Sequence, residues 1–221
     1  MRKLSFAAMA MLFLPYAQAE ERYCLNAVTT GNERTASVRC HQSNSDPLDL
    51  KSDPLIKAAF TTLELDPSLV DFKGCEGIGF RTTNSEADSG AKYLISYSSN
   101  TGDKSIAPVI HELGHVAQLE ISGGYRILSN LYSPTQIELG ADYLVGIVFK
   151  LGLPTESTAQ FERNIELAGI YMPARNASKN KHGNPSMRVQ AFRLGVHTNK
   201  NETKIKSIHQ DFQDNVYGTI N

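Results

Sequence analysis

The hydrophobic residues of this chain follow two different spacings. Residues 77–82 and 92–98 are short runs rich in β-branched and aromatic residues, and turn-forming residues separate them. Such runs predict β-strands. Between residues 54 and 64 the apolar positions instead fall three and four apart, as they do on one face of a helix.

Capping residues mark the ends of the predicted helices. Asp53-Pro54 and Asn184-Pro185 each place an N-cap residue before a proline, and Ser133-Pro134-Thr135-Gln136 adds the glutamine of a capping box. The small β-containing N-terminal part and the mostly helical C-terminal part predict an α+β fold in one domain. The predicted helices cover residues 54–64, 104–121, 134–151, 157–171, 185–196 and 205–217.

The first nineteen residues have the features of a secretory signal peptide. Met1-Arg2-Lys3 is basic, residues 4–17 are uncharged and mostly apolar, and Ala17-Gln18-Ala19 offers small residues to a signal peptidase. The apolar run is shorter than the ~20 residues that cross a bilayer. No later segment is apolar enough to span a membrane. We therefore expect residues 1–19 to be removed and residues 20–221 to be periplasmic or secreted.

Net charge and cysteine content bear on the partners of the chain and on its disulfide bonds. The formal net charge is −1, and removing the two basic residues of the signal peptide leaves 20 basic against 23 acidic residues, or −3. This balance predicts no nucleic-acid partner. In an oxidising compartment the three cysteines predict a disulfide. Cys24 and Cys40 could close a hairpin in an N-terminal extension, 20–53, but Cys75 could pair with either of them.

The stretch His111-Glu-Leu-Gly-His115 is the first candidate for chemistry. Residues four apart share one face of a helix, so both imidazoles can reach one metal ion. Glu112 is placed where its carboxylate can reach a metal-bound water and act as general base. The motif alone also fits two partly exposed helix histidines.

Two acids in an otherwise apolar helix favour the metal. Glu138 lies 23 positions after His115 (138 − 115), which leaves room for an antiparallel return, and Asp142 lies one turn further. A solvated helix face would also carry acids, but an unpaired buried carboxylate is costly, so a cation between the helices explains both better. We predict His111, His115 and Glu138 as zinc ligands, and Asp142 as the hydrogen-bond partner of a histidine ligand.

Three sequence blocks together resemble the gluzincins, the zinc peptidases typified by thermolysin, and within them a family of bacterial neutral zinc metallopeptidases. The blocks are 111–118 (HELGHVAQ), 138–142 (ELGAD) and 182–188 (HGNPSMR), in the family's order. The resemblance covers residues 106–196 and implies a zincin-like fold, one Zn²⁺ per chain and a peptide or protein substrate. The chain departs from the family at Val116, where a second histidine is often found.

The resemblance also implies roles for residues outside the ligand set. It makes His182 a catalytic candidate that stabilises the oxyanion, and Arg188 a charge partner or structural anchor. Tyr125 or Tyr132, in the connection between the ligand helices, could donate to the oxyanion instead. The strand at 92–98 is either an edge strand that pairs with substrate or an interior strand. The remaining histidines belong to no motif and are expected at the surface: His41, His197 and His209.

The sequence therefore predicts an exported zinc metallopeptidase in which Glu112 acts as general base. An alternative is a non-catalytic, zinc-stabilised binding protein on a peptidase scaffold. The presence of Glu112 favours the enzyme, because a retired site could lose the base and keep the ligands. A third hypothesis is a secreted helical domain without metal.

Overall fold

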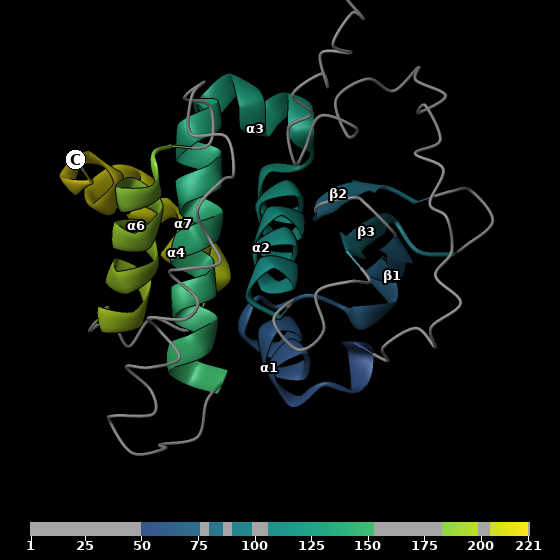
Figure 1. Ribbon diagram of the computed structural model, residues 1–221. Helices are drawn as coiled ribbons and strands as arrows, with labels where there is room; N and C mark the ends of the chain where they lie inside the picture. Colours follow the sequence, from purple (N-terminus) through teal and green to yellow (C-terminus); the bar gives the residue numbers. More distant parts are fainter. Residues whose placement is uncertain are drawn as a thin grey trace, which may run out of the picture.

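The computed structural model describes residues 50–75, 80–85, 90–98, 106–152, 183–198 and 204–220 (Figure 1). Several sequence predictions lie outside these ranges. They are the signal peptide, most of the extension 20–53 with Cys24 and Cys40, the helix at 157–171, and the catalytic candidate His182.

The described strands form one small mixed sheet. It contains β1 (Val70–Cys75), β2 (Arg81–Asn84) and β3 (Tyr93–Ser98), in the order β1-β3-β2. β1 runs parallel to β3, and β2 runs antiparallel to it. The strand predicted at 92–98 is therefore interior among the described strands, which removes the edge-strand alternative for it. β1 was not predicted at all.

The helices begin where their capping residues predict. The carboxylate of Asp53 accepts hydrogen bonds from the backbone at the start of α1 (Pro54–Thr62), and Asn184 does the same at α6 (Pro185–His197). Ser133 and Gln136 exchange the two bonds of a capping box at α4 (Pro134–Gly152). The other helical elements are α2 (Ile106–Ser122), α3 (Tyr125–Leu131), α7 (Ile205–Asp211) with its π-helical continuation Phe212–Val216, and 3₁₀ turns at Leu50–Ser52, Pro67–Leu69 and Tyr217–Thr219.

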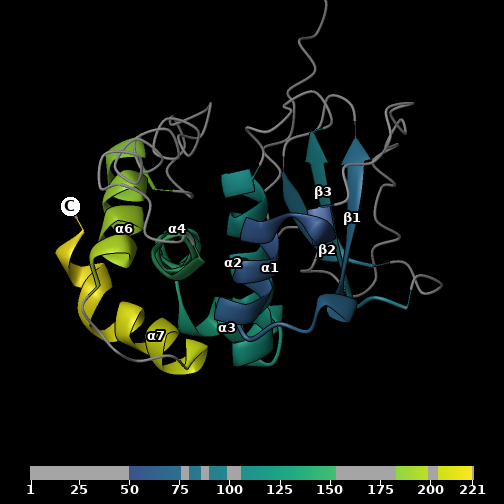
Figure 2. The ribbon, with the colours of Figure 1, turned by 90° about the horizontal axis from the view of Figure 1, so that it is seen from below.

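The elements are arranged around α4. Viewed along its axis, α4 lies at the centre of the helical part, with α2 on one side, α6 on the other and α7 passing below it (Figure 2). The three-stranded sheet lies on the far side of α2, so α2 separates the sheet from α4 (Figures 1 and 2). This position explains why every residue of α4 from Ile137 to Phe149 is buried.

Small residues allow α4 to approach its two neighbours closely. A Cβ on Gly114 of α2 would lie 3.3 Å from the Cα of Ala141, so these two helices are in near-backbone contact there. On the other side, Gly146 of α4 and Gly195 of α6 face each other, and a Cβ on either would overlap a backbone carbonyl of the opposite helix. The contact at Gly114 matters for the predicted metal site, because it brings α2, which carries His111 and His115, close to α4, which carries Glu138.

The α+β prediction is confirmed, and the zincin-like assignment stays a prediction. None of the helices in the described ranges has the length and apolarity needed to cross a bilayer.

Candidate metal centre

The structure brings the three predicted ligand residues together at the contact between α2 and α4. One nitrogen or oxygen atom from each of His111, His115 and Glu138 lies within 4.8 Å of the others, and all three side chains are buried. His111 contacts both Glu138 and Asp142, whereas His115, one turn later on α2, contacts Glu138, which is one turn earlier than Asp142 on α4. The two helices are therefore antiparallel, an arrangement for which the 23-residue separation leaves room. This group could hold a metal ion.

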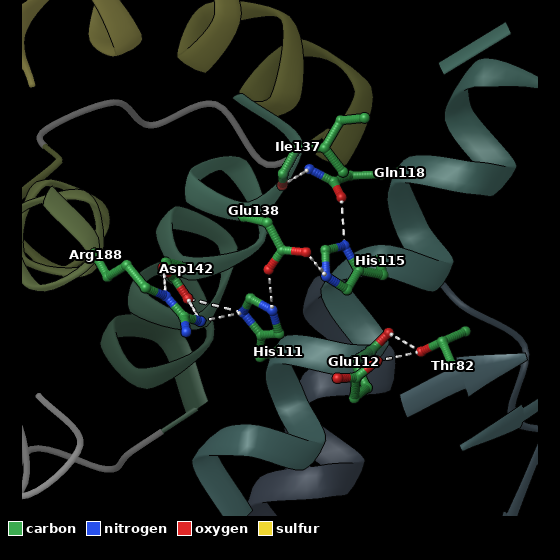
Figure 3. Close-up of polar contacts among 9 residues, drawn as sticks. All are labelled: Thr82, His111, Glu112, His115, Gln118, Ile137, Glu138, Asp142 and Arg188. Atoms are coloured by element: carbon green, nitrogen blue, oxygen red, sulfur yellow. Dashed lines mark hydrogen bonds and ion pairs between the residues drawn. The ribbon is translucent and has the colours of Figure 1, made fainter. Parts of the chain in front are cut away.

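His111 is held between two carboxylates. Its Nδ1 lies 2.8 Å from Oδ1 of Asp142, and its Nε2 lies 3.2 Å from Oε2 of Glu138 (Figure 3). Asp142 is held in turn by Arg188 of α6, whose Nε and Nη2 donate to its two oxygens at 2.7 and 2.8 Å. The Nδ1–H of His111 therefore donates to Asp142, so Nε2 is the nitrogen that faces the site.

His115 has a different kind of partner. Its Nδ1 lies 2.9 Å from Oε1 of Gln118, one turn later on α2, and its Nε2 lies 3.6 Å from Oε1 of Glu138. This Nε2 is buried and has no hydrogen-bond partner. A metal ion at the three-residue group would give this nitrogen the partner it lacks.

Glu112 occupies the side of the site next to the sheet. The hydroxyl of Thr82, on β2, lies 2.7 Å from Oε2 of Glu112 and 3.2 Å from its backbone carbonyl oxygen. Figure 3 shows Glu112 directed toward Thr82, beside the two histidines. β2 therefore positions the predicted general base, a role for which no sequence pattern provided a signal.

The buried charges around the group call for a cation. Glu112, Glu138 and Asp142 carry three carboxylates, and Arg188 is the matching guanidinium; all four residues are buried. With both histidines neutral, as they must be to ligate a metal, the sum is −2 (−3 + 1), which a divalent cation would balance. Because buried charges are costly unless paired, both the charge balance and the donor types of the site fit a bound metal dication.

The pKa values of the site follow from these neighbours. Burial lowers the pKa of His111, but the charge and hydrogen bond of Asp142 and the bond to Glu138 outweigh it and raise the value to about 9. Burial raises the pKa of Glu138, but the neighbouring imidazoles of His115 and His111 outweigh burial and hold the value well below its usual range. For Asp142 burial again raises the pKa, but the charge of Arg188 outweighs burial and holds the value below its usual range.

The structure also places the other residues that the sequence analysis singled out, namely Arg188, two tyrosines and two histidines outside the motif. Arg188 reaches the site as a charge partner of Asp142, one of its two predicted roles. Tyr125 begins α3, so the connection between the ligand helices is itself helical. Tyr132 packs its ring edge-on against His209, with centroids 5.6 Å apart. His197 is exposed, as expected, but the surface prediction for His209 is wrong because α7 packs that side chain inside the protein, 2% exposed.

Two functional candidates, Thr82 and Gln118, were not predicted. Gln118 was visible as part of the sequence block that begins at His111, one helical turn after His115, and this spacing was the available signal. Thr82 lies in a predicted strand 30 positions before Glu112, and no local pattern connects the two.

No family model, no curated protein and no solved structure matches the chain.

Proposed function

We propose that this chain is a zinc-dependent peptidase, with His111, His115 and Glu138 as ligands and Glu112 as general base. One observation carries the proposal. Two imidazoles and a carboxylate converge within 4.8 Å, and a fourth buried residue, Glu112, adjoins the first of them in the sequence.

The donor set favours zinc and a catalytic role. Two histidines and one glutamate leave a fourth position open on a tetrahedral ion, as catalytic zinc sites do. Zinc held in this way supplies an acidified water and a Lewis acid for a carbonyl group. Asp142 and Gln118 would keep the two imidazoles oriented toward the ion.

The protein's own residues supply the proton transfers. The Thr82 hydroxyl donates to Oε2 of Glu112, which leaves Oε1 to accept a proton from the attacking water. Glu112 then delivers that proton to the departing amine. His182 or a tyrosine remains the proposed donor to the oxyanion.

The position of β2 supports a peptide as substrate. β2 is at the edge of the described sheet, and Thr82 on this strand contacts Glu112. An extended peptide that paired with β2 through its main chain would pass beside the general base. Such pairing gives affinity with little sequence preference, so we propose a peptide or protein substrate.

The experiment is peptide cleavage with and without a chelator, followed by restoration with zinc. Glu112→Gln should keep bound zinc and lose turnover by about 10²–10⁴-fold, because the base is gone and the ligands remain. Glu120→Gln, on the same helix and outside the site, is the matched control and should keep full turnover. Cleavage retained by the Glu112 variant would contradict the assignment.

Metal loss tests the ligands separately. His111→Ala and Glu138→Ala should both purify with much less zinc than the wild type in elemental analysis, since each removes one of three ligands. Wild-type protein without zinc affinity would contradict the metal site itself.

One observation favours the alternative, a non-catalytic zinc-stabilised binding protein. All three ligand residues are no more than 5% exposed, and structural zinc sites are typically closed. In that case zinc would raise the thermal unfolding temperature, and no peptide in a library would be cleaved.

We also propose that the chain is exported and cleaved after Ala19, on the strength of its N-terminal sequence. Mass spectrometry of the protein from its native host tests this, because the mature chain should begin at Glu20.

A further inference from the structure

We propose that Gln118 is a positioning residue that makes His115 a metal ligand through Nε2 and ties this imidazole to helix α4. The inference rests on the metal site of the proposed function and extends it to the orientation of the second histidine ligand.

The amide of Gln118 has only one possible orientation. Gln118 is fully buried, and its Nε2 lies 2.8 Å from the backbone carbonyl oxygen of Ile137, in α4. A carbonyl oxygen can only accept, so the NH₂ group of the amide must face Ile137. The amide oxygen must then face His115.

This orientation determines which nitrogen of His115 carries the proton. The amide oxygen of Gln118 can only accept, so the Nδ1 that lies 2.9 Å away must be the donor. A neutral imidazole has one N–H, and Nε2 is therefore left with a free lone pair. That nitrogen is buried without a hydrogen-bond partner, 3.6 Å from Oε1 of Glu138.

The same amide joins the two helices that carry the ligands. Ile137 directly precedes Glu138 on α4, while His115 and Gln118 are on α2 (Figure 3). Gln118 thus orients the ring of His115 while it is itself held by the backbone of Ile137, the residue next to Glu138. Asp142 accepts from Nδ1 of His111 in the same way, so both histidines direct Nε2 toward the three-residue group.

Gly140 provides the space that this arrangement needs. A Cβ on Gly140 would lie 2.7 Å from Nε2 of Gln118, closer than side chains approach one another. Glycine is disfavoured inside a helix relative to alanine, and Gly140 lies well inside α4. The need to accommodate the Gln118 amide accounts for it.

The first test measures the His115 tautomer by ¹⁵N NMR in the metal-free protein above neutral pH. Wild type should show the Nδ1–H form, and Gln118→Met, which keeps the side-chain length, should gain the Nε2–H form. Gln213→Met is the matched control: the Gln213 amide also approaches Gly140, 3.4 Å from the same Cβ position, and has no hydrogen-bond partner. An unchanged tautomer in the Gln118 variant would overturn the proposal.

The second test is zinc affinity by chelator competition. Gln118→Met should weaken zinc binding by about 10–100-fold, as loss of a ligand's hydrogen-bond partner typically does, whereas Gln213→Met should not. If the wild-type protein bound no zinc, the proposed function would fail. The orientation of His115 by Gln118 could still be tested, because the tautomer measurement needs no metal. Unchanged affinity in the Gln118 variant would contradict the positioning role.

A double-mutant cycle keeps the inference testable if the methionine variant folds poorly. Gly140→Ala should weaken zinc binding in the wild-type background, because its methyl group displaces the Gln118 amide. In a Gln118→Ala background the same change should have a smaller effect, since the displaced side chain is absent. Strictly additive losses would show that Gly140 does not act through Gln118.

Discussion

At the residue scale, Asp142 connects the candidate metal centre to a third helix. Its two oxygens accept from Arg188, and Oδ1 also accepts from Nδ1 of His111. A buried carboxylate that serves a histidine ligand needs a cation of its own, and Arg188 provides it from α6. Both residues were predicted, Asp142 from its position in an apolar helix and Arg188 only from a family resemblance.

Removing Arg188 should destabilise the protein strongly. Arg188→Met leaves the Asp142 carboxylate buried with only His111 beside it, so the free energy of unfolding should fall by about 3 kcal/mol. Arg188→Lys should lose less, because an ammonium group restores the charge without the two parallel bonds. Denaturant unfolding of the metal-free proteins measures both. A methionine variant as stable as the wild type would show that the pair contributes nothing.

At the element scale, α4 is the helix on which the site depends. It contributes Glu138 and Asp142, and it packs against α2 through Ala141 and against α6 through Gly146. The crossing of Gly146 and Gly195 lies one turn from Asp142 along α4. The close contact there sets how near α6 can bring Arg188 to Asp142.

Adding one methyl group at this crossing should separate α4 and α6. A Cβ on Gly195 would overlap the carbonyl oxygen of Tyr143, so Gly195→Ala should lower the free energy of unfolding by about 1–3 kcal/mol. Gly218→Ala is the control, because nothing lies within 4 Å of its Cβ position. Chemical denaturation compares the two variants. Equal stability of both would mean that the crossing tolerates separation.

Local and non-local signals explain which elements were predicted. Caps and prolines act within a few residues of a helix end, so α1, α4 and α6 were predicted close to their true starts. β1 and α3 were missed because neither has a strong local signal. β1 is stabilised by its parallel pairing with β3, about twenty residues later in the chain, which sequence spacing does not reveal.

At the scale of the whole molecule, folding changes the pKa of a histidine outside the candidate metal group, His209. Burial lowers the pKa of His209 to about 4, and neither ring nitrogen has a hydrogen-bond partner. The side chain is therefore neutral in the folded protein at neutral pH. In the unfolded chain its pKa returns to about 6.5, so the unfolded state binds the extra proton between these two values.

Acid should therefore weaken the fold through His209. The free energy of unfolding should decrease as pH falls from about 6.5 to about 4, by up to about 3 kcal/mol from this residue. His209→Phe, which keeps a ring against Tyr132, should lose this part of the pH dependence. His197→Phe, at an exposed histidine, should keep it. Urea unfolding across this pH range measures the slope, and identical slopes for wild type and the His209 variant would contradict the prediction.

The sequence by itself determined the starts of α1, α4 and α6, the existence of the strand at residues 92–98 and the three donor residues of the candidate metal group. These features depend on local backbone preferences, on the spacing of two histidines along one helix and on the presence of an acid in another, apolar helix. Only the tertiary structure decided that the oriented amide of Gln118 contacts Nδ1 of His115, that Thr82 hydrogen-bonds to Glu112 and that His209 is buried. The first depends on the bond from Gln118 to the backbone of Ile137 in α4, which orients the amide. The other two depend on packing between elements that no short stretch of sequence specifies.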